Sequence, residues 1–414
     1  MTFDASGVGQ PGPADRVAQL LASMTLEEKL AQLVGLWEGR GGDGAVAPRQ
    51  HARQSDIDQL EEVAVHGLGH LTRVFGTRPV DPVDQSRELA RKQRWLQTET
   101  RLGIPAIAHE ECLTGLATWR ATTFPSPPAW GATFDPALVV RMGRAIGASM
   151  RSLGVHQGLA PVLDVVRDAR WGRVEECIGE DPFLVGELGT AYVRGLEEAG
   201  VVATLKHFVG YSASRSGRNL APVHAGPREV ADVLLPPFEM AVLDGGARSV
   251  MSSYNEIDGV PVSGDPALLT ELLRERWDFA GTVVADYFAV AFLHTLHRSA
   301  SDLADAAAQA LVAGIDVELP TGAGYREPLA ELIRSGGLDE AYVDRAVARV
   351  LQQKAELGLL DPGFDPEVDG GIELDPPEHR TIAARIAEQS VVLVANDGVL
   401  PLEEIGRASC RERV

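Results

Sequence analysis

The chain has 414 residues, of which 45% are hydrophobic and 23% are charged, so it can bury a large core. Its 38 basic and 59 acidic residues leave a net charge of −21. This charge argues against a nucleic acid or an anionic membrane as partner, because both require a basic face. Three cysteines are too few for a disulfide framework, and no apolar run reaches the length of a membrane span. Because no signal peptide is recognisable after Met1, we expect a cytoplasmic protein.

The N-terminal segment changes character at about residue 19. Residues 1–18 are small, polar and rich in proline and glycine, and we expect them to be flexible. Thr25 followed by Glu28 three positions later is the pattern of a capping box, which predicts a helix that starts at this point.

From there the chain alternates short apolar runs with stretches of helical periodicity. Eight runs are predicted strands: Gln32–Trp37, Gly69–Val74, Pro105–Glu111, Gly158–Asp164, Val202–His207, Ser249–Tyr254, Gly281–Tyr287 and Gly314–Leu319. Helices are predicted between them, for example at Pro136–Leu153, Pro182–Glu198, Pro227–Asp244, Pro266–Trp277 and Asp302–Ala313. This α/β rhythm favours a (β/α)8 TIM-type barrel over residues 19–360, although rhythm alone also fits a doubly wound open sheet.

The composition changes after residue 360. Residues 361–378 are rich in proline, glycine and aspartate and are expected to form a linker. A helix at His379–Gln389 and a strand at Val391–Ala395 follow. Because one helix and one strand cannot bury themselves, residues 379–403 are interpreted as the start of a second α/β domain that the chain does not complete.

The last residues have a different explanation. Residues 404–414 match, residue for residue, one reading frame of a common sequencing-adapter oligonucleotide. We therefore expect this tail, including Cys410, to be no part of the natural protein and to have no functional role.

Polar side chains close six of the predicted strands. In a barrel the carboxyl ends of all strands meet at one mouth, so these side chains are expected to converge on one cavity. They are Glu110, Glu111, Asp164, Lys206, His207, Tyr254, Asn255, Asp286, Tyr287, Asp316 and Glu318.

Three of these positions indicate sugar chemistry. Asp286 closes an apolar strand, as a carboxylate nucleophile for a retaining glycosidase would, but strand-end aspartates also cap helices. Lys206 and His207 are costly to bury unless they donate to a ligand, and the alternative is a surface lysine beside a core histidine. In the charged stretch that follows Asp164, Arg173 beside Trp171 would offer a planar donor and an apolar platform.

These residues carry a resemblance. The chain resembles the barrel domain of glycoside hydrolase family 3, the β-glucosidase and β-xylosidase family, from about residue 15 to residue 403. The landmarks are Met24–Lys29, Ile104-Pro105 with Glu111 and Gly115, Thr123–Pro125, Leu159–Asp164, Arg170–Arg173, Gly179–Pro182, Lys206–Phe208, Ser249–Asn255, Val283–Asp286 and Asn396–Gly398.

The resemblance implies a retaining, exo-acting β-glycosidase that releases terminal non-reducing β-D-glucose or β-D-xylose from an oligosaccharide or small-molecule glycoside, without a cofactor or a metal. Asp286 is the implied nucleophile, with Tyr254 beside it and Met251 lining the pocket. The residues implied to hold the sugar hydroxyls are Glu111, Arg173, Lys206 and His207, with Asp164 and Glu176 as further candidates nearby.

The chain departs from the family pattern in three places. Thr114 stands where a histidine is usual, and Tyr287 stands where a tryptophan is common, which bears on the platform for the leaving group. The general acid/base of the β-glucosidase branch is a glutamate of the second domain, so it is expected to be absent from this chain, and the activity of the chain is expected to be impaired.

Three alternatives remain at this stage. The family's β-N-acetylhexosaminidases carry an Asp/His pair on a barrel loop. The segment after Lys206 lacks the Gly-His-Gly-Asp pattern expected there, and His224 is the nearest histidine. A non-catalytic sugar-binding barrel would require a blocked nucleophile. A metal-dependent hydrolase would require a ligand set that His109, Glu110 and Glu111 do not supply.

Overall fold

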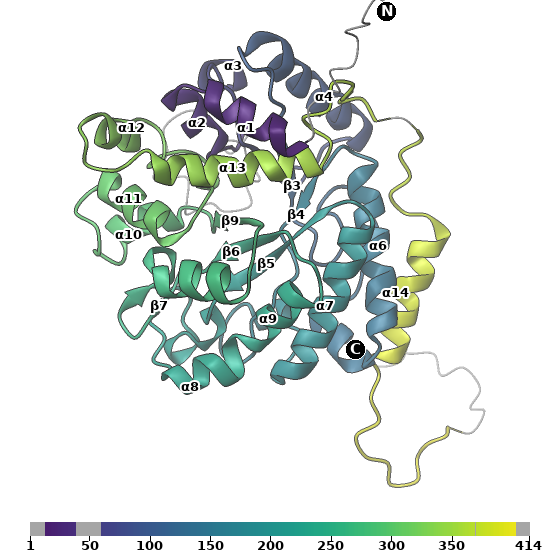
Figure 1. Cartoon of the computed structure of the whole chain (residues 1–414). Coiled ribbons are helices and arrows are strands. Elements are labelled where there is room, and N and C mark those ends of the chain that lie inside the picture. Colours follow the sequence, from purple (N-terminus) through teal and green to yellow (C-terminus); the bar gives the residue numbers. More distant parts are fainter. Residues whose placement is uncertain (1–12, 39–58, 369, 403–414) are drawn as a thin grey trace, which may run out of the picture.

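The computed structural model describes residues 13–38, 59–368 and 370–402 (Figure 1). The expectations for residues 1–12 and for the tail at 404–414 lie outside the described residues. The described residues contain a seven-stranded parallel sheet in the order β1-β2-β3-β4-β5-β6-β9 and a separate antiparallel pair, β7 with β8. The strands are β1 (Gly35–Leu36), β2 (His70–Thr72), β3 (Ile107–Glu110), β4 (Gln157–Gly158), β5 (Val202–Phe208), β6 (Ser249–Ser252), β7 (Glu256–Ile257), β8 (Val260–Pro261) and β9 (Thr282–Ala285).

The eighth predicted strand closes this sheet. Val317 forms a parallel β-bridge with Val284 of β9, and Glu318 forms one with Val34, which directly precedes β1. The backbone N–H of Glu318 also donates to the carbonyl of Leu33 over 2.9 Å. Segment 314–319 therefore joins the two edges of the sheet, and the prediction of a (β/α)8 TIM-type barrel is confirmed.

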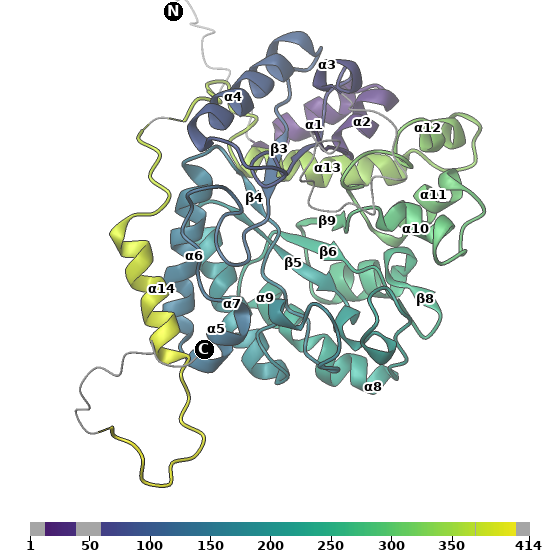
Figure 2. The ribbon, with the colours of Figure 1, turned by 180° about the vertical axis from the view of Figure 1, so that it is seen from behind.

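Helices surround the sheet (Figures 1 and 2). They are α1 (Pro13–Ser23), α2 (Leu26–Gln32), α3 (Leu60–Val63), α4 (Pro82–Glu99), α5 (Pro127–Thr133), α6 (Pro136–Arg151), α7 (Pro182–Glu198), α8 (Pro227–Glu229), α9 (Pro236–Leu243), α10 (Ala289–Thr295), α11 (Leu303–Ala313), α12 (Glu327–Arg334), α13 (Ala341–Glu356) and α14 (Pro377–Gln389). Short 3₁₀ turns lie at η2 (Val174–Glu176), η3 (Tyr211–Ala213), η4 (Arg215–Gly217) and η6 (Val262–Gly264), and π-helical turns lie at η5 (Val230–Leu234) and η7 (Ala267–Arg276). Among these helices none is long and apolar enough to cross a membrane.

Two helix predictions need correction. The stretch from Pro227 to Asp244 is divided into α8, η5 and α9. The boundary before α9 falls at Pro236 and Pro237, which lack the N–H groups that a continuous helix would need. The predicted helix at Pro266–Trp277 forms as the π-helix η7. The capping box at Thr25 and Glu28 is confirmed.

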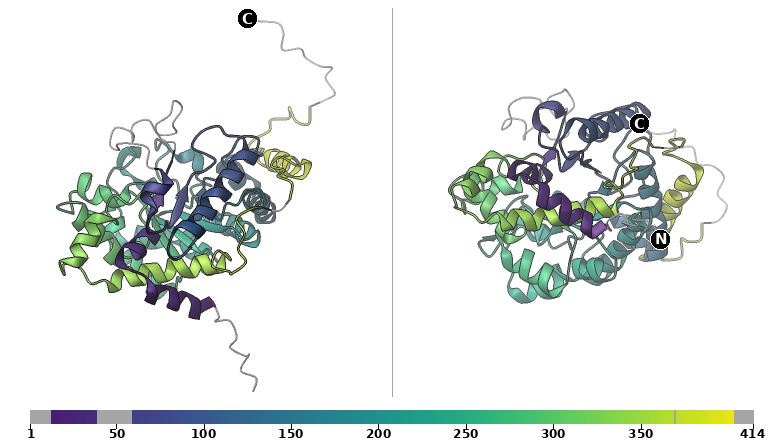
Figure 3. Two further views of the ribbon diagram at one scale, coloured as in Figure 1. Left: turned by 90° about the horizontal axis from the view of Figure 1, so that it is seen from above. Right: turned by 45° about the horizontal axis from the view of Figure 1, so that its top comes forward.

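The expected flexible N-terminus is wrong for residues 13–18, which lie in α1. This helix is amphipathic, with Val17 buried and Leu20 and Leu21 packed against the core. It packs along α13 on the outside of the barrel (Figure 3). Burial of this apolar face against the barrel outweighs the polar composition of the segment.

The C-terminal segment also differs from expectation. Helix α14 packs on α5 and α6 with Ile382 and Ile386 buried, so it lies against the barrel surface (Figure 1). That residues 379–403 begin a second domain remains a prediction. The predicted strand at Val391–Ala395 does not form. Its side chains are exposed, with Val394 at 92%, and no described strand lies beside it to accept its backbone hydrogen bonds.

Candidate active site

Asp286 follows β9 at the carboxyl end of the barrel. Its side chain points inward because it shares the strand face of Thr282, whose hydroxyl lies beside that of Ser249 on the adjacent strand β6, and Ser249 accepts from Gln157 of β4 inside the barrel. The N–H of Tyr287 donates to Oδ1 over 2.7 Å, while Oδ2 has no hydrogen-bond partner among the described residues. Burial raises the pKa of Asp286 to about 6, although the charge of Arg173 and the hydroxyl of Tyr254 act in the opposite direction. One carboxylate oxygen is thus anchored and the other is free.

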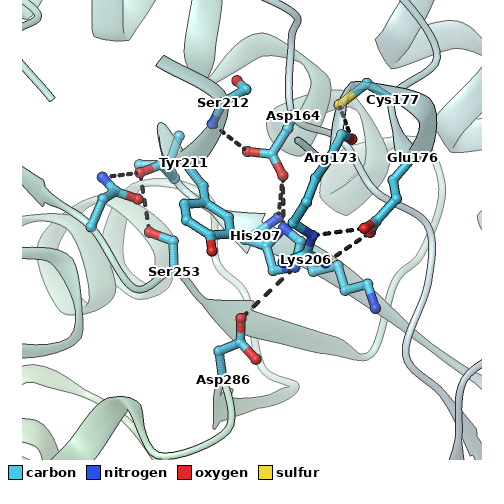
Figure 4. Close-up of polar contacts among 12 residues, drawn as sticks. Asp164, Arg173, Glu176, Cys177, Lys206, His207, Tyr211, Ser212, Ser253 and Asp286 are labelled. Atoms are coloured by element: carbon cyan, nitrogen blue, oxygen red, sulfur yellow. Dashed lines mark hydrogen bonds and ion pairs between the residues drawn. The ribbon is translucent and has the colours of Figure 1, made fainter. Parts of the chain in front are cut away.

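His207 lies between two carboxylates at the end of β5 (Figure 4). Its Nδ1 lies 2.8 Å from Asp164, and its backbone N–H donates to the same oxygen of Asp164 over 3.1 Å. Its Nε2 is 3.8 Å from Oδ2 of Asp286. Burial lowers the pKa of His207 well below its usual value, so the ring is neutral. With the Nδ1 proton donated to Asp164, Nε2 is an acceptor that faces the free oxygen of Asp286.

The carboxylate of Asp164 therefore binds His207 of the same chain and not a ligand. Burial raises its pKa to about 7, and the N–H groups of His207 and Ser212 donate to its two oxygens. Its exposed fraction is only 2%. The structure thus places it behind His207, where it orients the imidazole.

Lys206 forms an ion pair with Glu111. Their side chains meet at 2.8 Å, and they are 5% and 27% exposed respectively. Burial by itself would raise the pKa of Glu111, but the charges of Lys206 and Arg73 hold it below its usual value. The pair lies near the carboxyl ends of β3 and β5, where it offers a donor and an acceptor to a polyhydroxylated ligand.

Arg173 lies beside His207 and Lys206 and is held in place by Glu176 (Figure 4). Two hydrogen bonds of 2.7 Å join it to Glu176, and its guanidinium lies 5.4 Å from the centre of the Tyr211 ring. Trp171 is only 2% exposed and packs edge-on against Tyr211, 5.1 Å away. The expectation that Trp171 forms the apolar platform is therefore wrong. The ring that supports Arg173 is Tyr211, because the loop turns Trp171 inward.

The remaining predicted site residues surround Asp286. Tyr254 lies beside it, and its ring contacts that of Tyr211 at 5.6 Å. Met251 is buried on β6, on the same inward face as Ser249. The ring of Tyr287 packs on Trp37 at 5.2 Å, and its hydroxyl lies 3.2 Å from Nε2 of His109.

Four other strand-end residues do not reach the site. The three carboxylates bind groups of the protein itself: Glu110 accepts from the N–H groups of Phe75, Gly76 and Glu111, Asp316 from Arg274 and Arg349, and Glu318 from the N–H groups of Gly324 and Tyr325. Asn255 donates its Nδ2 to the carbonyl of Val209, while its Oδ1 has no partner among the described residues. The predicted convergence of polar strand ends is thus only partly correct. A buried carboxylate can be satisfied by loop amides as well as by a ligand.

Three residues near the site were not singled out from the sequence. Tyr211 packs between His207 and Tyr254, with its buried hydroxyl lacking a partner among the described residues. Trp37 and Arg73 stand at the ends of the first and second predicted strands, where the strand-end rule used for Asp286 applies equally. Within the described ranges, no three His, Cys, Asp or Glu side chains lie together as metal ligands.

Comparisons with known proteins identify the family. Residues 25–353 match the model of the glycosyl hydrolase family 3 N-terminal domain. The chain belongs to glycoside hydrolase family 3. It is 36% identical over 326 residues to a β-xylosidase of Formosa agariphila, an alignment that covers 73% of this chain and 45% of that protein. It is 34% identical to a β-glucosidase of Rhizobium radiobacter, with 73% of this chain and 36% of that protein covered.

Solved structures agree with this assignment. A β-glucosidase from Erythrobacter marinus superposes with a TM-score of 0.84 at 37% identity, over 95% of this chain and 52% of that one. A mutant β-glucosidase from Listeria innocua in complex with laminaribiose superposes with a TM-score of 0.81 at 29% identity, over 94% of this chain and 53% of that one. The chain spans about half the length of the proteins that it matches.

Proposed function

We propose that this chain is the nucleophile-bearing part of a retaining exo-β-glycosidase that releases terminal β-D-glucose or β-D-xylose. The observation that carries the proposal is the free Oδ2 of Asp286, buried and flanked by the donors and acceptors of Lys206, His207 and Glu111. A sugar buried there exchanges its hydration for these groups, and C1 is left facing the carboxylate. The relatives are named β-xylosidases and β-glucosidases, which supports this substrate class. A cytoplasmic location remains a prediction.

The mechanism follows from this arrangement. Oδ2 of Asp286 attacks C1 of the terminal sugar, a covalent bond forms between them, and the bond from C1 to the leaving oxygen breaks. Lys206, Arg173 and Nε2 of His207 bind sugar hydroxyls, and Glu111 accepts from one. Water then attacks C1 and passes its proton to the group that protonated the leaving oxygen, the C1–Asp286 bond breaks, and the sugar leaves with its β configuration retained.

The proton for the leaving oxygen has to come from another group. The carboxylates around Asp286 already accept hydrogen bonds: Glu111 from Lys206, Glu176 from Arg173 and Asp164 from His207. None is left as a donor, so we infer that the general acid lies outside the described residues. His224, the candidate for the hexosaminidase alternative, is exposed on its loop, and nothing in the structure favours that role.

A mechanism-based probe tests the proposal. 2,4-Dinitrophenyl 2-deoxy-2-fluoro-β-D-glucoside and its xyloside counterpart carry a leaving group that requires no protonation, and the fluorine slows hydrolysis of the covalent intermediate. We expect the chain to gain the mass of one fluoro-sugar, located on Asp286 by peptide mass spectrometry. Labelling elsewhere, or none, would overturn the proposal.

The pH dependence of labelling follows from the pKa of Asp286. Only the ionised carboxylate attacks, and burial raises its pKa to about 6. The labelling rate is therefore expected to rise about tenfold per pH unit below pH 6 and to level off above it. Initial labelling rates between pH 4.5 and 8 measure this. A midpoint near the ordinary value of 3.8 would contradict the buried environment.

The ion pair between Lys206 and Glu111 is a second target. Lys206→Met removes a charged donor and leaves the Glu111 carboxylate without its partner, so we expect labelling efficiency to fall about 10- to 100-fold. Lys29→Met is the matched control, because Lys29 pairs with Glu340 at the N-terminus of α13 and with Asp344 on α13, on the outside of the barrel. The control is expected to lose stability in urea denaturation but to label at the parent rate. Equal labelling by both variants would remove Lys206 from the site.

A further inference from the structure

Arg73 occupies an unusual position at the barrel mouth. It follows β2 with a φ of +47°, a left-handed conformation that is uncommon for residues other than glycine and is typical of functional sites. Its side chain is 13% exposed, and its Nη2 donates to the carbonyl of Gly76 over 3.3 Å. The fold therefore holds a cation at the edge of the site in a conformation that costs free energy.

Trp37 fixes the guanidinium in place. The charge of Arg73 lies 5.8 Å from the centre of the Trp37 ring. The indole N–H of Trp37 donates to Oγ1 of Thr77, which donates in turn to the backbone carbonyl of Arg73, and both bonds are 2.7 Å long. Since Trp37 also packs on Tyr287, this network connects Arg73 to the residue that follows Asp286.

One donor of Arg73 is left open. Nε is buried and has no hydrogen-bond partner among the described residues. Its nearest carboxylate oxygen, Oε1 of Glu110, is 3.9 Å away, and Glu110 is already occupied by the N–H groups of Phe75, Gly76 and Glu111. A buried donor without an acceptor is costly, which indicates that a ligand supplies one.

The charge of Arg73 also reaches the site directly. It helps to hold the pKa of Glu111 below its usual value and acts on Tyr287 as well. Arg73 thus lies near Glu111, which follows β3, and near Tyr287, which follows β9. Because it comes from β2, it is separated in sequence from every other residue assigned to the site.

On the basis of the function proposed above, we propose that Arg73 is a further sugar-binding residue, whose Nε donates to a hydroxyl of the terminal sugar held between Asp286 and Glu111. Trp37 sets the plane of the guanidinium, and the network through Thr77 holds both. The residue thereby determines which hydroxyl pattern the site accepts.

The test pairs variants of Arg73 with sugars that lack single hydroxyls. The probes are the 2,4-dinitrophenyl 2-deoxy-2-fluoro-β-D-glucoside and its 3-deoxy, 4-deoxy and 6-deoxy analogues, and the readout is labelling efficiency on Asp286. The variants are Arg73→Met and Arg73→Lys, with Arg78→Met as control, since Arg78 is exposed in the same loop. Circular dichroism and thermal denaturation confirm that each variant folds.

We expect Arg73→Met to lower labelling by the parent probe about 10- to 100-fold, the effect of losing a charged hydrogen bond. For one deoxy analogue this loss should vanish, because the hydroxyl that Arg73 binds is already missing. Arg73→Lys should restore part of the efficiency, and Arg78→Met should match the parent chain.

The outcomes separate the two proposals. If the parent chain is not labelled on Asp286, the proposed function fails and this inference fails with it. If the parent chain is labelled but Arg73→Met lowers labelling equally for every analogue, or not at all, the function stands and Arg73 has only a structural role.

Discussion

Asp286→Asn is expected to abolish covalent labelling by the fluoro-sugar probes and to reduce turnover of 2,4-dinitrophenyl β-D-glucoside by about 10⁴-fold or more, the scale on which enzymes lose activity without a central catalytic group. The physical reason is the loss of the attacking oxygen. Oδ2 is the atom of Asp286 without a hydrogen bond, and an amide nitrogen or oxygen in its place cannot form a stable glycosyl ester. Stopped assays with the dinitrophenyl substrate and intact-protein mass spectrometry measure both effects.

The stability of the Asp286→Asn variant shows whether its loss of activity comes from misfolding. The pKa of Asp286 is raised from 3.8 to about 6, so between these values the folded chain binds a proton that the unfolded chain lacks, and stability falls as pH rises through this window. At pH 7 the asparagine variant is therefore expected to be as stable as the parent or more stable, by at most about 3 kcal/mol. Asp278→Asn is the matched control, because Asp278 is exposed just before β9. Retained labelling in Asp286→Asn would exclude Asp286 as nucleophile.

The effect of the leaving group on the efficiency of hydrolysis is expected to be nearly as large as the effect of Asp286→Asn. Because the described residues offer no free carboxylic acid beside Asp286, we expect this chain to hydrolyse methyl β-D-glucoside or cellobiose about 10²- to 10⁴-fold less efficiently, relative to a dinitrophenyl glucoside, than a full-length family enzyme does. Alkoxide leaving groups need a proton as the C1–O bond breaks, whereas dinitrophenolate does not. The full-length β-glucosidase from Erythrobacter marinus is a suitable reference, since it superposes on 95% of this chain.

Rescue by azide tests whether the general acid/base is the group that limits turnover. Azide attacks a glycosyl-enzyme without help from a general base, so it should accelerate turnover of the dinitrophenyl substrate by this chain and yield the β-glycosyl azide. The full-length reference should show little acceleration. If this chain hydrolysed cellobiose as efficiently as the reference, the general acid would have to lie within the chain, and the expectation that a second domain supplies it would be wrong.

Much of the barrel could be predicted from local patterns. Runs such as Val202–Leu205 are mainly apolar because both faces of a parallel strand are buried, and a proline or aspartate at the start of a periodic stretch marks a helix, as at Pro182. The convergence of Asp286, Lys206 and His207 follows from the same logic, since all parallel strands end at one mouth. These inferences need only neighbouring residues and the handedness of the chain.

Side-chain partners were harder to predict. Whether Asp164 binds a ligand or orients His207, and whether Trp171 faces the site or the core, depends on how a loop packs against residues that are distant in sequence. The same holds for the C-terminal helix α14. The spacing of its apolar residues predicted a helix, but its packing on α5 and α6 depends on surfaces that no local pattern specifies.

The sequence by itself therefore determined the strand and helix pattern, the family and the residue types that carry the chemistry, because these depend on local periodicity and on motifs. Only the tertiary structure decided which polar atoms are occupied and which are free. It showed that Glu110, Asp316 and Glu318 are satisfied by the protein, while Oδ2 of Asp286 and Nε of Arg73 are not. Occupancy is decided by contacts between segments far apart in the chain, and those contacts exist only once the barrel has closed.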